Sequence, residues 1–237
     1  TDEGHRLTVK DPILMLDTIL NGSWHTMDFA KHCGAHKLLS GSSGAIYGKQ
    51  PSDLTHISEE YNGTLDVTDI AAAYVEGKRT SEVLCLQYSR QYGIEGKVFR
   101  GFSFVGPYLP LDIHYAIGNF IGDAVSGRPI QVKGDGTPYR SYLYAADAAI
   151  WLWTILCRGS TGSIYNVGSE EEFTIAEVAS LVSQTAQPPN IVRISGQPAP
   201  RQLSERYIPS TQKARTELGL KQYIGLTDAI NRTIEWY

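Results

Sequence analysis

Residues 42–48 read Ser-Ser-Gly-Ala-Ile-Tyr-Gly and follow a short apolar run at residues 37–39. Such a run is typical of a buried strand in a parallel sheet. Open α/β sheets bind their ligands in the crevice at the carboxyl ends of the strands. We therefore expect a parallel α/β sheet with a strand at about 36–43, and the hydroxyls of Ser42 and Ser43 in that crevice.

Farther along the chain, Tyr74 and Lys78 stand four residues apart. On a helix this spacing places both side chains on one face. A neighbouring ammonium favours the phenolate and lowers the pKa of a tyrosine from about 10. A serine hydroxyl can hydrogen-bond the oxygen whose proton is being moved. If Ser43 meets these two side chains, the three residues form a proton-transfer site.

The serine strand with S-S-x-x-x-Y-G, followed by Y-x-x-x-K, resembles the short-chain dehydrogenase/reductases. More narrowly, it resembles their extended branch of NAD-dependent nucleotide-sugar epimerases and dehydratases, from about Asp11 to the C-terminus. The resemblance implies a Rossmann-type parallel sheet and a smaller C-terminal α/β substrate domain. It also implies NAD as cofactor, with NADP not excluded, a nucleotide-sugar substrate, and a homodimer formed through helices at 12–33 and 74–92.

The same resemblance implies a role for each residue of the serine and tyrosine motifs. Tyr74 acts as acid and base, and Ser43 hydrogen-bonds the substrate oxygen. Lys78 stabilises the phenolate and binds the nicotinamide ribose. Ser42 either caps the strand or contacts the cofactor.

The glycine-rich dinucleotide fingerprint, which in this family precedes the serine strand, does not occur in these 237 residues. We interpret Gly41, Gly44 and Gly48 as part of the serine strand and its exit turn. The chain thus resembles the C-terminal two thirds of an extended enzyme, with the sheet incomplete at its N-terminal half. We expect residues 1–108, with 129–166 in part, to belong to the NAD-binding domain and 109–237 mainly to the substrate domain.

Four further residues match positions that hold the sugar nucleotide in this family. Arg140 begins a close match to R-x-F-x-Y-V-x-D, whose arginine pairs with phosphates because a planar guanidinium binds two oxygens at once. Arg201 stands where relatives place a second such arginine, and Asn119 where they contact the diphosphate. Ser103 replaces the asparagine of R-x-x-N-x-x-G-P, so that substrate contact departs from the pattern.

The two residues after Ser43 separate the reactions known in the family. Dehydratases carry Asp-Glu directly after their serine or threonine, and decarboxylases carry glutamate two positions after it. Gly44 and Ala45 cannot move a proton. We therefore expect an epimerase that transiently oxidises the sugar at C4. A 4,6-dehydratase, a 4-keto reductase and a non-catalytic fragment are the alternatives.

Composition limits the other classes of function. Apolar residues make up 42% and charged residues 19%, which is typical of a soluble globular protein. A net charge of −4 argues against nucleic acid as a partner. The apolar run at 145–157 is too short for a membrane span. With no signal peptide visible, we expect a cytoplasmic protein. We interpret the three cysteines as free and buried, and the six histidines as showing no metal-ligand spacing (Cys33, Cys85, Cys157; His5, His25, His32, His36, His56, His114).

Local signals predict where the helices begin and end. Asp11 and Pro12 start the first helix, and Thr174 with Glu177 forms a capping box. Asp147 is expected to cap a helix, and Val83 to face inward from the helix that Tyr74 begins. The remaining predictions are helices at 114–127, 174–185, 210–218 and from about 227, and strands at 97–100, 128–132, 165–168 and 191–193.

Overall fold

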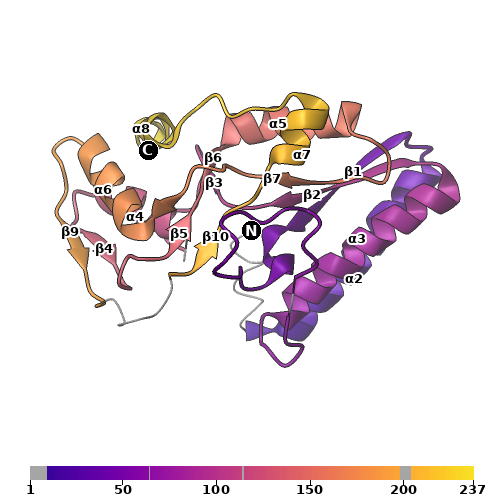
Figure 1. Cartoon of the computed structure of the whole chain (residues 1–237), viewed down its shortest axis with the longest axis horizontal. Helices are drawn as coiled ribbons and strands as arrows, with labels where there is room; N and C mark the ends of the chain where they lie inside the picture. Colours follow the sequence, from indigo (N-terminus) through magenta and orange to yellow (C-terminus); the bar gives the residue numbers. More distant parts are fainter. Residues whose placement is uncertain (1–9, 64, 114, 198–203) are drawn as a thin grey trace.

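The computed structural model describes residues 10–63, 65–113, 115–197 and 204–237. Its central sheet is parallel, in the order β1-β2-β7 (Figure 1). These strands span Lys37–Ser43, Glu95–Gly101 and Ile164–Val167. The paired register brings Ser43 opposite Gly101, and Gly101 opposite Val167. The predicted parallel sheet is confirmed, and its three carboxyl ends lie at one edge.

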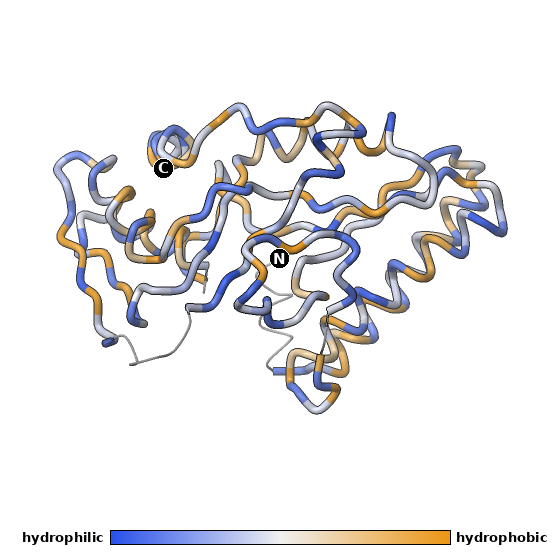
Figure 2. The backbone as a smooth tube through the Cα atoms, viewed as in Figure 1, coloured by the Kyte–Doolittle hydropathy of each residue, from blue (hydrophilic) through white to orange (hydrophobic). Residues whose placement is uncertain are grey.

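Helices cover both faces of this sheet (Figure 1). On one face lie α2 (Pro12–His32) and α3 (Ala72–Tyr92), and on the other α5 (Ala145–Arg158) and α7 (Gln212–Leu218). The Asp11 carboxylate caps α2 by accepting a hydrogen bond from the Leu14 backbone N at 2.9 Å. Gly93 ends α3 with φ +71°, a conformation that glycine adopts without strain. Hydrophobic residues recur along both α2 and α3 in Figure 2.

A second hydrophobic core lies beside the central sheet, around α4 (Ala116–Val125), α6 (Ile175–Thr185) and α8 (Leu226–Trp236). Strands β4 (Ile130–Val132) and β9 (Val192–Ile194) pair in parallel there. The capping box at the start of α6 is present as predicted, because Thr174 and Glu177 bond to each other's backbone N–H.

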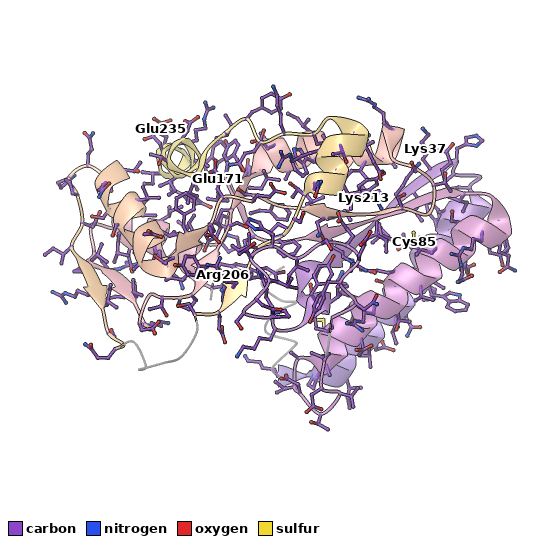
Figure 3. All side chains as sticks on the ribbon, viewed as in Figure 1. Lys37, Cys85, Glu171, Arg206, Lys213 and Glu235 are labelled. Atoms are coloured by element: carbon purple, nitrogen blue, oxygen red, sulfur yellow. The ribbon has the colours of Figure 1, made fainter. Side chains whose placement is uncertain are left out.

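Short strands connect the central sheet and the second core. The sheet β10-β5-β8 joins Arg206–Tyr207, Tyr139–Arg140 and Phe173–Thr174, and β3 (Phe104–Val105) pairs with β6 (Leu143–Tyr144). β5 and β10 lie between the two regions in Figure 1, and the label on Arg206 marks the same place in Figure 3. The segment Arg206–Tyr207 therefore lies beside Tyr139–Arg140, between the central sheet and the second core.

Several side chains lie elsewhere than the sequence predicts. Val83 is exposed, because the buried face of α3 includes the polar residues Ser81, Glu82 and Ser89 instead. Asp147 does not cap a helix, because α5 already begins at Ala145. Its Oδ2 accepts hydrogen bonds from the backbone N–H groups of residues 223 and 224 at 3.0 and 2.9 Å.

The predicted burial of the cysteines holds only for Cys85, since Cys33 and Cys157 are exposed. Burial raises the pKa of the Cys85 thiol to about 11. None of the described helices is both long and apolar enough to cross a membrane. In the described ranges, no group of three or more His, Cys, Asp or Glu side chains is arranged to hold a metal ion.

Candidate functional site

The serine strand ends at Ser43, where the chain turns into the short 3-10 helix η1 (Gly44–Tyr47). The Ser43 Oγ caps this helix by accepting a hydrogen bond from the Ala45 backbone N at 3.1 Å. Gly48 closes the turn with φ +69°. The glycines at 41, 44 and 48 therefore belong to a strand and its exit turn, as predicted.

A buried network fixes this turn to the rest of the sheet. The Tyr47 hydroxyl donates to Asn166 Oδ1 at 2.8 Å and accepts from Arg100 Nη1 at 2.8 Å. Arg100 also binds the Glu82 carboxylate through Nε and Nη2, at 3.0 and 2.8 Å. Because Glu82 belongs to α3, the ion pair fixes the helix of Tyr74 against the strands.

Lys78 reaches from α3 to the serine strand. Its Nζ donates to the Gly41 carbonyl at 3.1 Å and lies 6.0 Å from the ring centre of Tyr74. Burial lowers the pKa of the Lys78 ammonium. The helix thus carries Tyr74 and Lys78 on one face, as the four-residue spacing predicts, and Lys78 contacts β1.

Tyr207 is a residue of this site that the sequence analysis missed. It pairs with Arg140 in the parallel register of β10 and β5. Burial raises the pKa of the Tyr207 hydroxyl, and the oxygen of that hydroxyl lies 2.6 Å from where a Cβ on Gly44 would stand. The structure therefore brings Tyr74 and Lys78 together on α3, with Lys78 against the serine strand, and places Tyr207 beside Arg140.

The other residues that are predicted to contact the cofactor or the substrate lie in different surroundings. The Ser42 Oγ is buried and has no hydrogen-bond partner among the described residues. Arg140 is partly exposed, donates to the Tyr139 carbonyl at 2.8 Å, and lies 4.0 Å from Glu205. The backbone carbonyl of Ser103 accepts from the Leu143 N at 3.0 Å. Arg201 lies outside the described residues.

Asn119 lies in a cavity of about 620 Å³ between α4 and β4. Apolar side chains and two cations, Arg128 and Lys133, contribute to its wall. Arg128 is paired with Asp123 at 3.1 Å. Pro138, two residues before Arg140, also lines this cavity.

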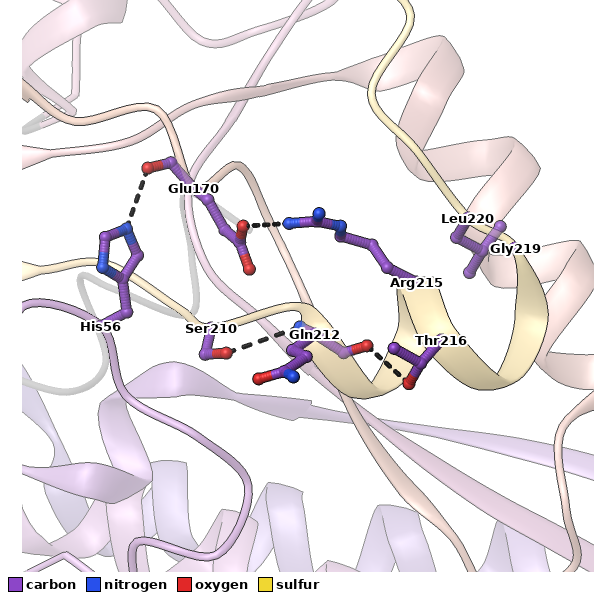
Figure 4. A pocket seen from close by; sticks show the side chains of 8 residues that line it. All are labelled: His56, Glu170, Ser210, Gln212, Arg215, Thr216, Gly219 and Leu220. Atoms are coloured by element: carbon purple, nitrogen blue, oxygen red, sulfur yellow. Dashed lines mark hydrogen bonds and ion pairs between the residues drawn. The ribbon is translucent and has the colours of Figure 1, made fainter.

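A second cavity, of about 640 Å³, lies beside α7 and is shown in Figure 4. Its polar groups bond to one another: Arg215 Nη1 pairs with Glu170 Oε2 at 2.6 Å, and His56 Nε2 bonds the Glu170 carbonyl at 3.0 Å. None of the described candidate site residues lines it. The edge at Ser43 is therefore the better candidate site.

Comparison with known proteins gives a family and a set of relatives. The model of the NAD dependent epimerase/dehydratase family matches residues 2–168. UDP-glucuronic acid decarboxylase 6 of Arabidopsis thaliana is 32% identical over 223 residues, which are 93% of this chain and 62% of that protein. UDP-glucuronic acid decarboxylase 1 of Danio rerio is 29% identical over 227 residues, 96% of this chain and 53% of that protein. The chain thus spans less than two thirds of the length of these relatives.

Solved structures of similar fold match nearly the whole chain. UDP-glucose 4-epimerase from Thermus thermophilus, in complex with NAD, has a TM-score of 0.82 at 25% identity and covers 97% of this chain; the match spans 73% of the epimerase chain. UDP-glucose 4-epimerase from Thermotoga maritima, solved with UDP-glucose, has a TM-score of 0.83 at 19% identity. The match covers 98% of this chain and 72% of the epimerase chain. These matches confirm the Rossmann-type fold.

Proposed function

Because the chain belongs to the NAD-dependent epimerase/dehydratase family, we propose that it carries the catalytic residues of a nucleotide-sugar epimerase. One observation carries the proposal. The Lys78 ammonium bonds to the strand that ends in Ser43, and it stands 6.0 Å from the ring of Tyr74 on the same helix face. This is the geometry that a proton-transfer site needs.

In the proposed reaction Tyr74, as phenolate, removes the proton from the C4 hydroxyl of the sugar. The nearby Lys78 ammonium stabilises the phenolate by its charge. Ser43 hydrogen-bonds the same sugar oxygen and holds it in line. Ser42, Tyr74 and Lys78 would hold NAD, which would supply the acceptor and donor for the C4 hydride, and Tyr74 would give the proton back to the sugar oxygen when the hydride returns to the opposite face. Acid–base groups of this kind contribute about 10²–10⁴-fold to a rate.

The residues beside the proposed base fit the nicotinamide end of NAD. The buried Ser42 Oγ has no partner among the described residues, and the sole hydrogen bond described for the Lys78 Nζ goes to Gly41. Both groups suit ribose hydroxyls, which donate and accept hydrogen bonds. Ser42, Tyr74 and Lys78 are thus the proposed cofactor contacts, and NADP is the alternative cofactor, since RMD from Pseudomonas aeruginosa, 25% identical with a TM-score of 0.81, was solved with NADPH.

The cavity at Asn119 is the proposed nucleotide site. Apolar walls with placed polar groups are typical of small-molecule pockets. This cavity combines apolar side chains such as Phe120 with Asn119 and Lys133, and three carboxylates, Asp112, Asp123 and Asp135, also line it. Arg140, with donors to spare, is proposed to bind the diphosphate between this cavity and Ser43. Ser103 and Arg201 are proposed as further substrate contacts.

The reaction proposed is epimerisation, although the curated relatives described above are decarboxylases. Gly44 and Ala45 offer no side chain that can exchange a proton, and the Ala45 backbone N is already bonded to Ser43. Decarboxylation is the second candidate, and the names of the relatives favour it.

The assembly proposed is a cytoplasmic homodimer formed through α2 and α3. Within each chain, residues 1–108, with part of 129–166, would form the cofactor domain. Residues 109–237 would mainly form the substrate domain. Exposed apolar side chains on α2, among them Ile13 and Phe29, support the choice of that surface.

The product formed tests this proposal. The protein is incubated with NAD⁺ and, separately, UDP-glucose, UDP-glucuronic acid and dTDP-glucose, and the products are separated by chromatography. A C4 epimer of one of these sugars is expected. Release of carbon dioxide with a UDP-pentose would replace epimerase by decarboxylase, and a 4-keto-6-deoxy product would replace it by dehydratase. No conversion of any substrate would overturn the proposal.

A further inference from the structure

We propose that Tyr108, Trp236 and Tyr237 form a latch that holds one wall of the nucleotide cavity in place. The wall is the loop of residues 109–113, which connects β3 to α4. The three latch residues, all of them described, do not line the cavity themselves. They are therefore positioning residues, which act through the loop on the affinity for the nucleotide. The inference rests on the proposed function, because it takes this cavity as the nucleotide site.

The loop contributes to the cavity and packs directly on α4. Residues 111–113 line the cavity. A Cβ placed on Gly118 would lie 2.5 Å from the Pro110 carbonyl oxygen, and one placed on Gly122 would lie 2.9 Å from the Leu111 carbonyl oxygen. Glycine at these two positions lets the loop backbone approach the helix this closely. The shape of the cavity therefore depends on how the loop lies against α4.

The loop begins in a turn with an unfavourable backbone conformation. The Leu109 backbone N donates to the Gly106 carbonyl at 3.2 Å, and Pro107 and Tyr108 stand between them. Tyr108 has φ +63°, and among the described residues it is the only non-glycine residue with a positive φ. Proline followed by a positive φ is the pattern of a type II turn, in which glycine usually takes the second of these places. A tyrosine there costs free energy, so the surrounding contacts must hold it.

The end of α8 supplies contacts of this kind. The Trp236 ring packs on the Tyr108 ring, with centroids 4.8 Å apart. The Tyr237 hydroxyl donates to the Leu109 carbonyl at 2.6 Å. α8 itself is fixed, because Ile230 is fully buried in the second core and the helix packs beside α4 (Figure 1). A helix anchored in the core thus holds a tyrosine that is itself 79% exposed.

The latch therefore affects binding rather than chemistry. Without it, the turn would exchange between positive and negative φ, and the loop would no longer be fixed in one direction. The apparent Kd rises in inverse proportion to the fraction of molecules whose wall is in place. Ser43, Tyr74 and Lys78 belong to the central sheet and α3. We therefore expect the latch to change KM for the sugar nucleotide and to leave kcat unchanged.

Two substitutions of Tyr108 separate the backbone conformation from the loss of the ring. Tyr108→Ala loses the ring and keeps the unfavourable conformation, so we expect Kd for UDP in calorimetry to rise about 10-fold, or about 1.4 kcal/mol. Tyr108→Gly loses the same ring, but glycine adopts a positive φ without strain, and its Kd should stay near that of the wild type. Equal losses in the two variants, or no loss in Tyr108→Ala, would overturn the inference.

Removing the hydroxyl of Tyr237 tests the second contact of the latch. Tyr237→Phe keeps the ring and loses the hydrogen bond to Leu109, so KM for the sugar nucleotide should rise about 5-fold with kcat unchanged. The control is Tyr223→Phe, an exposed tyrosine on the segment before α8, which should keep the wild-type KM. A fall in kcat, or a KM equal to that of the control, would contradict the role of Tyr237.

The same titrations distinguish a failure of the latch from a failure of the proposed function. If the wild-type protein binds none of UDP, dTDP and GDP, the cavity is not a nucleotide site, and the latch is rejected with it. If the wild-type protein binds one of them and Tyr108→Ala and Tyr237→Phe bind it equally well, only the latch is rejected.

Discussion

At the scale of single residues, the pKa of a charged group near the site depends on how deeply that group is buried. Glu59 accepts a hydrogen bond from the Asn166 backbone N at 2.7 Å, in the network that holds Tyr47 and Arg100. Burial raises the pKa of Glu59 above its ordinary value of 4.5, although this hydrogen bond and the charges of Lys213 and Arg100 lower it. The folded protein therefore holds the Glu59 proton more tightly than the unfolded chain does.

This shift predicts a pH dependence of stability. Because the folded pKa is raised, the contribution of Glu59 to the free energy of unfolding is greatest below pH 4.5 and falls as pH rises through the folded pKa. Glu59→Gln keeps an acceptor for Asn166 and removes the titration. Urea unfolding measured from pH 4.5 upward should show a smaller decline for the variant. Parallel curves for the two proteins would contradict the assignment.

Among the elements, α3 is fixed to the sheet by the ion pair of Glu82 and Arg100. Both side chains are at most 10% exposed, and Nη2 lies 2.8 Å from Oε2. Breaking a buried pair by removing one partner leaves the other charge buried without compensation. The orientation of Tyr74 and Lys78 relative to Ser43 therefore depends on this contact between α3 and β2.

Removing Glu82 should cost much more than removing a pair at the surface. We expect Glu82→Ala to lower the free energy of unfolding by about 3–5 kcal/mol, and Arg100→Met together with Glu82→Ala to recover part of that loss. The control is Asp228→Ala, which breaks an exposed pair with Arg232 and should cost at most about 1 kcal/mol. Chemical denaturation measures all three. A Glu82→Ala loss no larger than that of the control would contradict this account.

For the molecule as a whole, the exposed apolar residues on α2 and α3 predict self-association. Phe29 is 72% exposed, and the others on these helices are Ile13, Leu14, Trp24, Val83 and Tyr92. A second copy of the chain would bury them, as the proposed dimer requires. Phe29→Glu should shift the protein from dimer to monomer in light scattering. The control is Ile191→Glu, an exposed apolar position next to β9, which should leave the mass unchanged. A monomeric wild-type protein would contradict the proposed dimer.

The features that the sequence predicts correctly are those decided by neighbouring residues. The caps at Asp11 and Thr174 are local hydrogen bonds, and the serine strand is a local apolar run that ends in small residues. Tyr207 could not be found in this way, because β10 follows a loop rich in Pro, Gln and Ser and pairs with a strand more than sixty residues earlier. Val83 and Asp147 were misplaced for the same reason, since the Glu82–Arg100 pair and the contact of α5 with residues 223–224 are tertiary.

The most direct test of the central claim is the turnover of Tyr74→Phe, because phenylalanine keeps the ring of the proposed base and lacks its hydroxyl. We expect kcat for C4 epimerisation to fall by about 10²–10⁴-fold, while UDP still binds with wild-type affinity in calorimetry. Tyr92→Phe, at the far end of the same helix, is the control and should keep full activity. A Tyr74→Phe protein that turns over at the wild-type rate would contradict the claim that Ser43, Tyr74 and Lys78 form the catalytic site.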